Sequence, residues 1–138
     1  MAVAGNYALM RLVGDSSNDN SMLESIYEYC RAKAFAEEGF PFDQNTLVFK
    51  ICGKIFILLS LEATPLQINL KCNPLRAIEL RENHPSVIPG YHMNKKHWNT
   101  VILDGSISNS LIFDMINHSY ELVVNGLSKT QKEAIQSV

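Results

Sequence analysis

The chain has 138 residues, of which 46% are hydrophobic and 19% are charged, and its formal net charge is −2. A chain of this length ordinarily forms one domain that buries its own core. The small negative charge excludes a protein that is basic over its whole surface, and no apolar run reaches the ~18 residues that a membrane helix needs.

The chain begins with residues 1–20, which lack the cationic start and long apolar run of a signal peptide and end in polar residues. We predict that residues 1–20 form a flexible extension and that residues 21–138 form a single domain. Ser21 and Glu24 have the spacing of a capping box, which predicts that a helix begins at Ser21. Its buried stripe consists of Leu23, Ile26, Tyr27, Cys30 and Ala34, and Gly39 and Pro41 follow as helix breakers.

Strands come next along the chain. Two apolar runs, 46–52 and 54–61, flank Gly53, which predicts a tight hairpin. The second run is apolar on both faces and therefore predicts a central strand. Residues 67–72 alternate between polar and apolar, as a half-exposed strand does, and residues 97–103 predict a further strand.

Asn73 followed by Pro74 is typical of a helix start, so we predict a short helix that runs through Arg81. Leu75 and Ile78 are its expected inward residues. Two prolines at 85 and 89 predict a rigid loop after this helix.

The last third of the chain predicts helices. A long apolar helix is expected over residues 111–124, with Gly126 as a left-handed residue after its end. Its polar stripe consists of Asp114, His118, Glu121 and Asn125. Ser128 and Gln131 form a second capping box, which predicts a short final helix. The order of elements predicts an α+β fold in which N-terminal and C-terminal helices flank an antiparallel sheet of four to five strands.

Positive charge is concentrated in one window. Residues 71–98 carry five Lys or Arg against two Glu, a net +3, whereas the residues before and after this window are net negative. The local potential rather than the net charge determines where an anion binds. This window also contains most of the segment 89–105, which runs from a Pro-Gly turn to an Asp-Gly turn and includes the only tryptophan, Trp98.

Several blocks of the sequence resemble the MmcQ/YjbR family over about residues 22–135. The long run Pro89-Gly-Tyr-His-Met-Asn-Lys95 with His97-Trp-Asn-Thr100 carries the resemblance. It is supported by Phe40-Pro-Phe42, Leu47-Val-Phe-Lys50, Gly53-Lys54, Asn69-Leu-Lys-Cys72 and His118-Ser-Tyr120. Cys52 stands where the family's hairpin turn has a glycine, and Asn73 where an aspartate is usual. The resemblance implies a CyaY-like fold and the DNA-binding label that this family commonly carries, although a fold alone does not transfer an activity.

We therefore consider a nucleic-acid interface around the 91–98 loop. The cationic candidates for phosphate contacts are Lys71, Arg76, Lys95 and Lys96, and the stacking candidates are Tyr91, His92 and Trp98. Asn94 and Asn99 could form hydrogen bonds with phosphates or base edges, and His97 of the same loop completes the ten predicted contact residues. Three or four phosphate contacts predict weak binding, with a logarithmic salt slope on duplex DNA of about −3 to −4.

Three alternatives to this interface stay open. Trp98 and Tyr91 could instead belong to the core, with Lys95 and Lys96 forming only a solvated turn. The loop could also bind a small anion through Lys95 and His97, with Trp98 as an apolar wall. A protein partner could cover the apolar strand at residues 55–61.

The sequence contains no catalytic signature, and we expect neither enzymatic activity nor a cofactor. Cys30, Cys52 and Cys72 are odd in number and widely spaced, so we expect free, mostly buried thiols in a cytoplasmic protein without a membrane partner. His92 and His97 are five residues apart with no further ligand between them, which does not predict a metal site.

Overall fold

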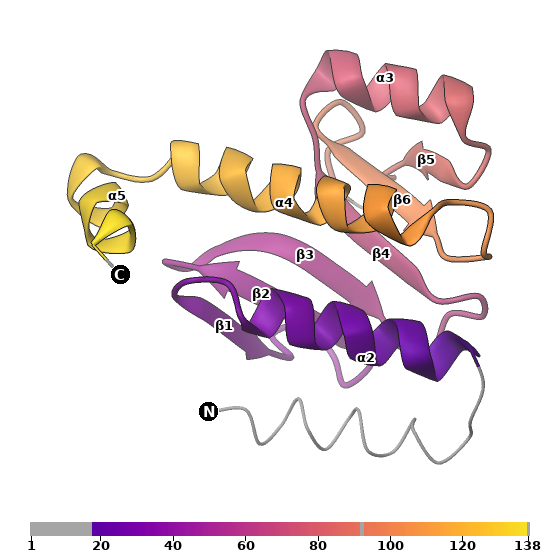
Figure 1. Cartoon of the computed structure of the whole chain (residues 1–138), viewed down its shortest axis with the longest axis horizontal. Helices are drawn as coiled ribbons and strands as arrows, with labels where there is room; N and C mark the ends of the chain where they lie inside the picture. The colour runs from indigo at the N-terminus through magenta and orange to yellow at the C-terminus, as the bar shows by residue number, and fades with distance from the viewer. Residues whose placement is uncertain (1–17, 92, 138) are drawn as a thin grey trace.

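The computed structural model describes residues 18–91 and 93–137. The expected flexibility of residues 1–17 and the expected role of His92 lie outside the described residues. Six strands form one antiparallel sheet in the order β1-β2-β3-β4-β6-β5, so the prediction of four to five strands was too low (Figure 1). The strands are β1 Ala36–Gly39, β2 Thr46–Ile51, β3 Lys54–Ser60, β4 Gln67–Lys71, β5 Val87–Pro89 and β6 Trp98–Ile102.

Helices pack on one face of this sheet, which confirms the α+β class. Helix α4 contacts β3 and β4, and α2 contacts β1, as their position in front of the sheet in Figure 1 shows. The described helices are α2 Asn18–Arg31, α3 Pro74–Asn83, α4 Asn109–Asn125 and α5 Lys129–Gln136. None of the helices in the described part of the chain is long and apolar enough to span a membrane.

Helix α2 begins at Asn18, three residues before the predicted start at Ser21. Residues 16–20 are all Ser, Asn or Asp, which are good N-cap residues, so the capping pattern at Ser21 did not identify a unique start. The predicted stripe from Leu23 to Cys30 is buried, whereas Ala34 lies beyond the end of the helix.

The short edge strand β1 was not predicted, because its sequence Ala-Glu-Glu-Gly has none of the β-branched or aromatic residues typical of strands. It pairs antiparallel with β2 through the backbone. Phe35, with φ of 59°, turns the chain from the end of α2 into this strand.

The β2–β3 hairpin is confirmed. Cys52 and Gly53 connect its strands, with φ values of 49° and 78°, as in the two-residue turns that favour Asn-Gly or Gly-Gly. The register shifts between Phe49 and Lys50, and this bulge allows the adjacent Phe56 and Ile57 both to be buried.

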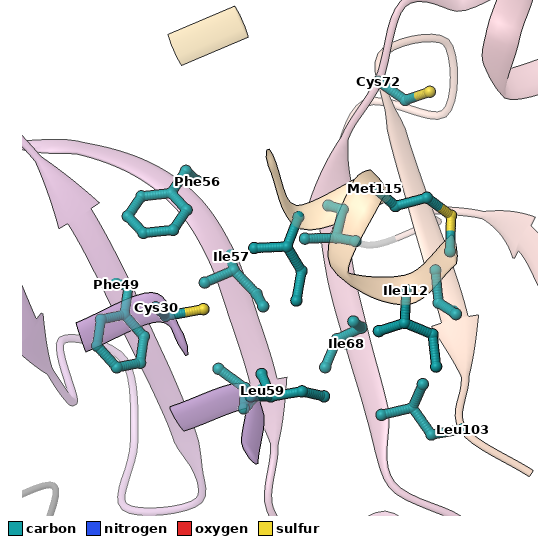
Figure 2. Close-up of a cluster of buried hydrophobic side chains, with 14 of the residues drawn as sticks. Cys30, Phe49, Phe56, Ile57, Leu59, Ile68, Cys72, Leu103, Ile112 and Met115 are labelled. Carbon is teal, nitrogen blue, oxygen red and sulfur yellow. The ribbon is translucent and has the colours of Figure 1, made fainter. Parts of the chain in front are cut away.

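The core lies between the sheet and the helices, and Figure 2 shows a part of it. Phe49 and Phe56 pack with ring centroids 6.2 Å apart, and Tyr120 of α4 contacts Phe56 edge-on at 5.1 Å. The three cysteines are free, and Cys30 and Cys72 are buried, which agrees with the prediction of free, mostly buried thiols. Burial raises the pKa of the Cys30 thiol to about 12.

The phase of α3 differs from the prediction. Leu75 is 79% exposed and Ile78 is 50% exposed, whereas Ala77 and Leu80 belong to the buried core. The N-cap at Asn73 is confirmed, since its Oδ1 accepts hydrogen bonds from the backbone N–H groups of the next turn. The inner face of α3 contains the small residue Ala77, which allows close packing against the sheet. Because both faces of this helix carry apolar residues, hydrophobicity alone did not show which face is buried.

The segment at residues 85–89 was predicted as a loop but contains the edge strand β5, which pairs with β6. Pro89 fits there because one side of an edge strand has no neighbouring strand, so that side does not need the backbone N–H group that proline lacks.

After α4, Gly126 has φ of −86° and is not left-handed, contrary to the prediction. Its N–H donates to the Val123 carbonyl, so the chain continues in a right-handed turn that brings Leu127 into the core. The capping box of Ser128 and Gln131 at the start of α5 is confirmed.

Candidate nucleic-acid interface

Strand alternation places Lys71 and Trp98 on the face of the sheet opposite the helices. Their neighbours Leu70 and Asn99 point toward the helices, and Leu70 belongs to the core cluster. Val48 and Leu58 are also buried but are not part of that cluster, as expected for residues on the opposite face. Lys71 and Trp98 are direct partners in the β4–β6 register, so their Cβ atoms lie about 5 Å apart.

The loop at residues 90–97 joins β5 to β6 beside this pair. Asn94 organises the loop, since its Oδ1 accepts hydrogen bonds from the backbone N–H groups of Lys96 at 2.9 Å and His97 at 3.2 Å. Its backbone carbonyl accepts hydrogen bonds from the Trp98 N–H at 2.8 Å and the His97 N–H at 3.1 Å. The predicted contact role of Asn94 is therefore weakened, because its acceptor oxygen is already used within the loop.

Gly90 allows the loop to start against Trp98. Its N–H donates to the Trp98 carbonyl at 2.8 Å. A Cβ atom at position 90 would lie 3.0 Å from both the Cβ and the carbonyl oxygen of Trp98. Only glycine fits this close approach without displacing backbone.

The outer part of the loop presents an aromatic ring and two cations. Tyr91 is 61% exposed, and Lys95 and Lys96 are exposed as well. The Lys95 Nζ lies 5.3 Å from the centroid of the Tyr91 ring, within the range of a cation–π contact. Trp98 and His97 are half-buried, so the tryptophan is neither sealed in the core nor fully exposed.

Arg81 of α3 holds this loop, a role that the sequence did not reveal. Its Nε donates to the Asn99 Oδ1 at 2.7 Å, and its NH2 group donates to the carbonyls of Lys95 and, at 3.4 Å, Trp98. An arginine in the last turn of a helix ordinarily suggests an interaction with that helix's own carbonyls. Its sequence position therefore gave no signal of these long-range partners.

Asn99 is 2% exposed and does not belong to the interface, contrary to the prediction. Its position in β6 turns its side chain toward the helices, where it accepts the Arg81 bond. Among the described residues, its Nδ2 is a buried side-chain nitrogen without a hydrogen-bond partner.

Arg76 is also separated from the loop. Its guanidinium lies 2.5 Å from an Asp114 carboxylate oxygen and joins α3 to α4. His118 lies at the same junction, where its Nε2 accepts the Asn73 N–H at 3.2 Å. Burial, together with the nearby Arg76, lowers the pKa of His118.

Five of the ten predicted contact residues thus meet at one end of β4 and β6: Lys71, Tyr91, Lys95, Lys96 and Trp98. We call these five residues the loop–sheet surface. Within the described residues, no group of three His, Cys, Asp or Glu is placed to hold a metal ion.

Fold and surface define an α+β domain whose antiparallel sheet is covered by helices on one face and carries a basic, aromatic loop at one end. The model of the YjbR family matches residues 31–122, and the chain belongs to this family. The "uncharacterized protein YbdF" of Escherichia coli O157:H7 is 42% identical over 118 residues, which cover 82% of this chain and 96% of that protein. The "uncharacterized protein YjbR" of Escherichia coli K12 is 32% identical over 113 residues, with the same coverage.

Solved structures share the fold. The crystal structure of the Deinococcus radiodurans protein DR2400, which contains the family-model domain DUF419, superimposes with a TM-score of 0.77 at 38% identity and covers 83% of this chain and 87% of that chain. A crystal structure of a Pseudomonas syringae protein gives a TM-score of 0.62 at 27% identity and covers 72% of this chain and 96% of that one.

Proposed function

We propose that the protein is a non-catalytic nucleic-acid-binding protein that binds weakly and in a salt-dependent manner through the loop–sheet surface. One observation carries this proposal: exposed Tyr91, Lys95 and Lys96 project from a loop whose backbone Arg81 and Asn94 hold in place. A preorganised loop loses little conformational entropy on binding. Ammonium groups contact phosphates, and aromatic rings stack on bases of any sequence.

The number of free cations sets the expected strength. Arg76 is paired with Asp114, so Lys71, Lys95 and Lys96 remain as the phosphate contacts of this surface. Three contacts predict a slope of log K against log salt of about −2.7 on duplex DNA and about −2.1 on a single strand. Binding of this kind is measurable at low ionic strength and becomes weak at physiological salt.

The test is fluorescence anisotropy with labelled duplex and single-stranded oligonucleotides over a series of salt concentrations. Replacing Lys95 and Lys96 with Ala should weaken binding to every sequence and flatten the duplex slope by about two. Lys129 and Lys132 of α5, at the far end of the molecule in Figure 1, provide a control with the same change in charge. Equal loss of binding in both double variants, or no binding at low salt, would contradict the proposal.

We also propose that the protein has no catalytic activity, because the nucleophilic side chains of Ser119 and Cys72 are buried. Ser119 Oγ donates to the Phe56 carbonyl at 2.5 Å and accepts from the Lys71 N–H at 2.9 Å, so it is bound within the core. Burial raises the pKa of the Cys72 thiol, which disfavours the nucleophilic thiolate.

A protein partner is a second candidate, favoured by one observation. Leu75 and Ile78 lie three residues apart on the outer face of α3 and are both exposed. Adjacent exposed aliphatic side chains on one helical face can serve as anchors for a protein partner. Replacement of both by Ser should abolish such a contact without affecting nucleic-acid binding. An affinity isolation in which the original chain and the double variant retain the same partner would reject this second candidate.

A further inference from the structure

The direction in which Trp98 points distinguishes between two forms of nucleic acid. Trp98 lies on the sheet face opposite the helices, and Tyr91 lies on the loop beyond Gly90. These two rings are separate platforms, and each can stack only on a base whose face is accessible. In a duplex the base faces are covered by their neighbours, whereas in a single strand they can be splayed apart.

Charge on the same sheet face is unequally distributed. Lys50 follows the core residue Phe49 and therefore shares the face of Lys71, but it lies directly opposite Glu37 in the β1–β2 register. Opposite charges in such a cross-strand position attract each other. The Lys50 end of the face is thus close to neutral, and the uncompensated charge lies at Lys71, next to Trp98 and the loop.

We infer that the preferred ligand is a single-stranded nucleic acid that places one base on Trp98 with its phosphate at Lys71 and continues over the loop to Tyr91. This inference rests on the proposed nucleic-acid function and specifies its ligand class and its path. A sheet that carries an aromatic side chain on the face away from its helices can stack an unpaired base on that ring. The half-buried position of Trp98 suits a base that lies flat against the sheet.

Trp98 is the only tryptophan in the chain, so its fluorescence reports directly on this site. An unlabelled 12-nucleotide oligo(dT) at low salt should quench the emission of the full chain in a saturable manner, and a hairpin duplex of equal phosphate content should bind more weakly and quench less. Saturable binding of the duplex with equal affinity would overturn the inference.

Two pairs of variants test the path by anisotropy with labelled oligo(dT). Trp98→Leu keeps an apolar side chain against Gly90 but removes the stacking surface, and should weaken binding about 5- to 100-fold, whereas Trp98→Phe should retain most of it. Lys71→Gln should reduce the salt slope by about 0.7, and Lys50→Gln, on the same face, should leave it unchanged. Circular dichroism of each variant establishes that it is folded.

The outcomes separate this inference from the function on which it rests. Binding that depends on Lys95 and Lys96 but is unaffected by Trp98→Leu and Lys71→Gln would retain the loop as a nucleic-acid site and reject the path over the sheet. Equal effects of Lys50→Gln and Lys71→Gln would also reject the path. Failure of both oligonucleotides to bind would reject the proposed function itself.

Discussion

Arg81 and Asn99 form a partly buried connection between helix α3 and strand β6, with 2.7 Å between the arginine Nε and the amide Oδ1. The same guanidinium also donates to two carbonyls at the base of the 90–97 loop. One side chain therefore connects the core to the surface that we propose for binding.

Replacing Arg81 with Lys should show how much of the loop's order depends on this connection. Lysine keeps the charge but has no planar fork with which to donate to three acceptors. We expect the free energy of unfolding to fall by about 1–3 kcal/mol, because Asn99 and the loop carbonyls lose their donor. Urea denaturation measures the change in stability, and hydrogen exchange of the amides at 94–98 should become faster.

Arg31 provides the matched control for that substitution. It forms an exposed ion pair with Glu28 at 3.4 Å within helix α2. Arg31→Lys should change the free energy of unfolding by less than about 0.5 kcal/mol. Similar losses in the two variants would mean that Arg81 contributes no more than a surface arginine.

These contacts show where prediction from sequence succeeded and failed. The hairpin around Gly53 and the caps at Asn73 and Ser128 were predictable, because they depend on local backbone chemistry. The Arg81 contact and the inward turn of Asn99 were not, since they depend on how α3 packs against β6. Alternation along β6 separates Asn99 from Trp98, and no spacing in the sequence shows which of the two faces the helices.

A second prediction concerns the hairpin turn, where Cys52 has φ of 49° and Gly53 has φ of 78°. A left-handed conformation costs an ordinary L-residue about 1 kcal/mol, and Asn tolerates it better. Cys52→Asn should therefore raise the free energy of unfolding by about 0.5–1 kcal/mol, measured by urea denaturation. Gly53→Ala should lower it by a similar amount. An unchanged stability in both variants would show that the turn is not strained.

A third prediction tests the observed phase of α3 against the one that the sequence suggested. Leu80 is buried in the core, so Leu80→Ala should lower the free energy of unfolding by about 2–4 kcal/mol. Leu75 is exposed, and Leu75→Ala should change it by less than about 0.5 kcal/mol. Thermal unfolding of both variants at one pH compares them directly, and a larger loss for Leu75 would reverse the assignment of the helix faces.

The last prediction follows from His118, which accepts the Asn73 N–H through its unprotonated Nε2. Burial lowers its pKa below the ordinary value of 6.5, and the Arg76 guanidinium lowers it further, outweighing the opposite effect of Glu121 and Asp114. As the pH falls through 6.5, the unfolded chain binds a proton that the folded protein does not yet bind. Stability should therefore decrease from pH 7.5 toward pH 5.5.

His118→Gln separates this contribution from the titration of the other groups. Glutamine supplies a carbonyl oxygen that can accept the Asn73 N–H but does not titrate. Urea denaturation of both proteins at pH 7.5, 6.5 and 5.5 should give a smaller decrease in the variant, so that the difference in stability between the two proteins shifts in favour of the variant as the pH falls. Parallel pH profiles would mean that His118 has the same pKa in the folded and unfolded chain, and that the contact between α4 and the start of α3 does not depend on its neutral form.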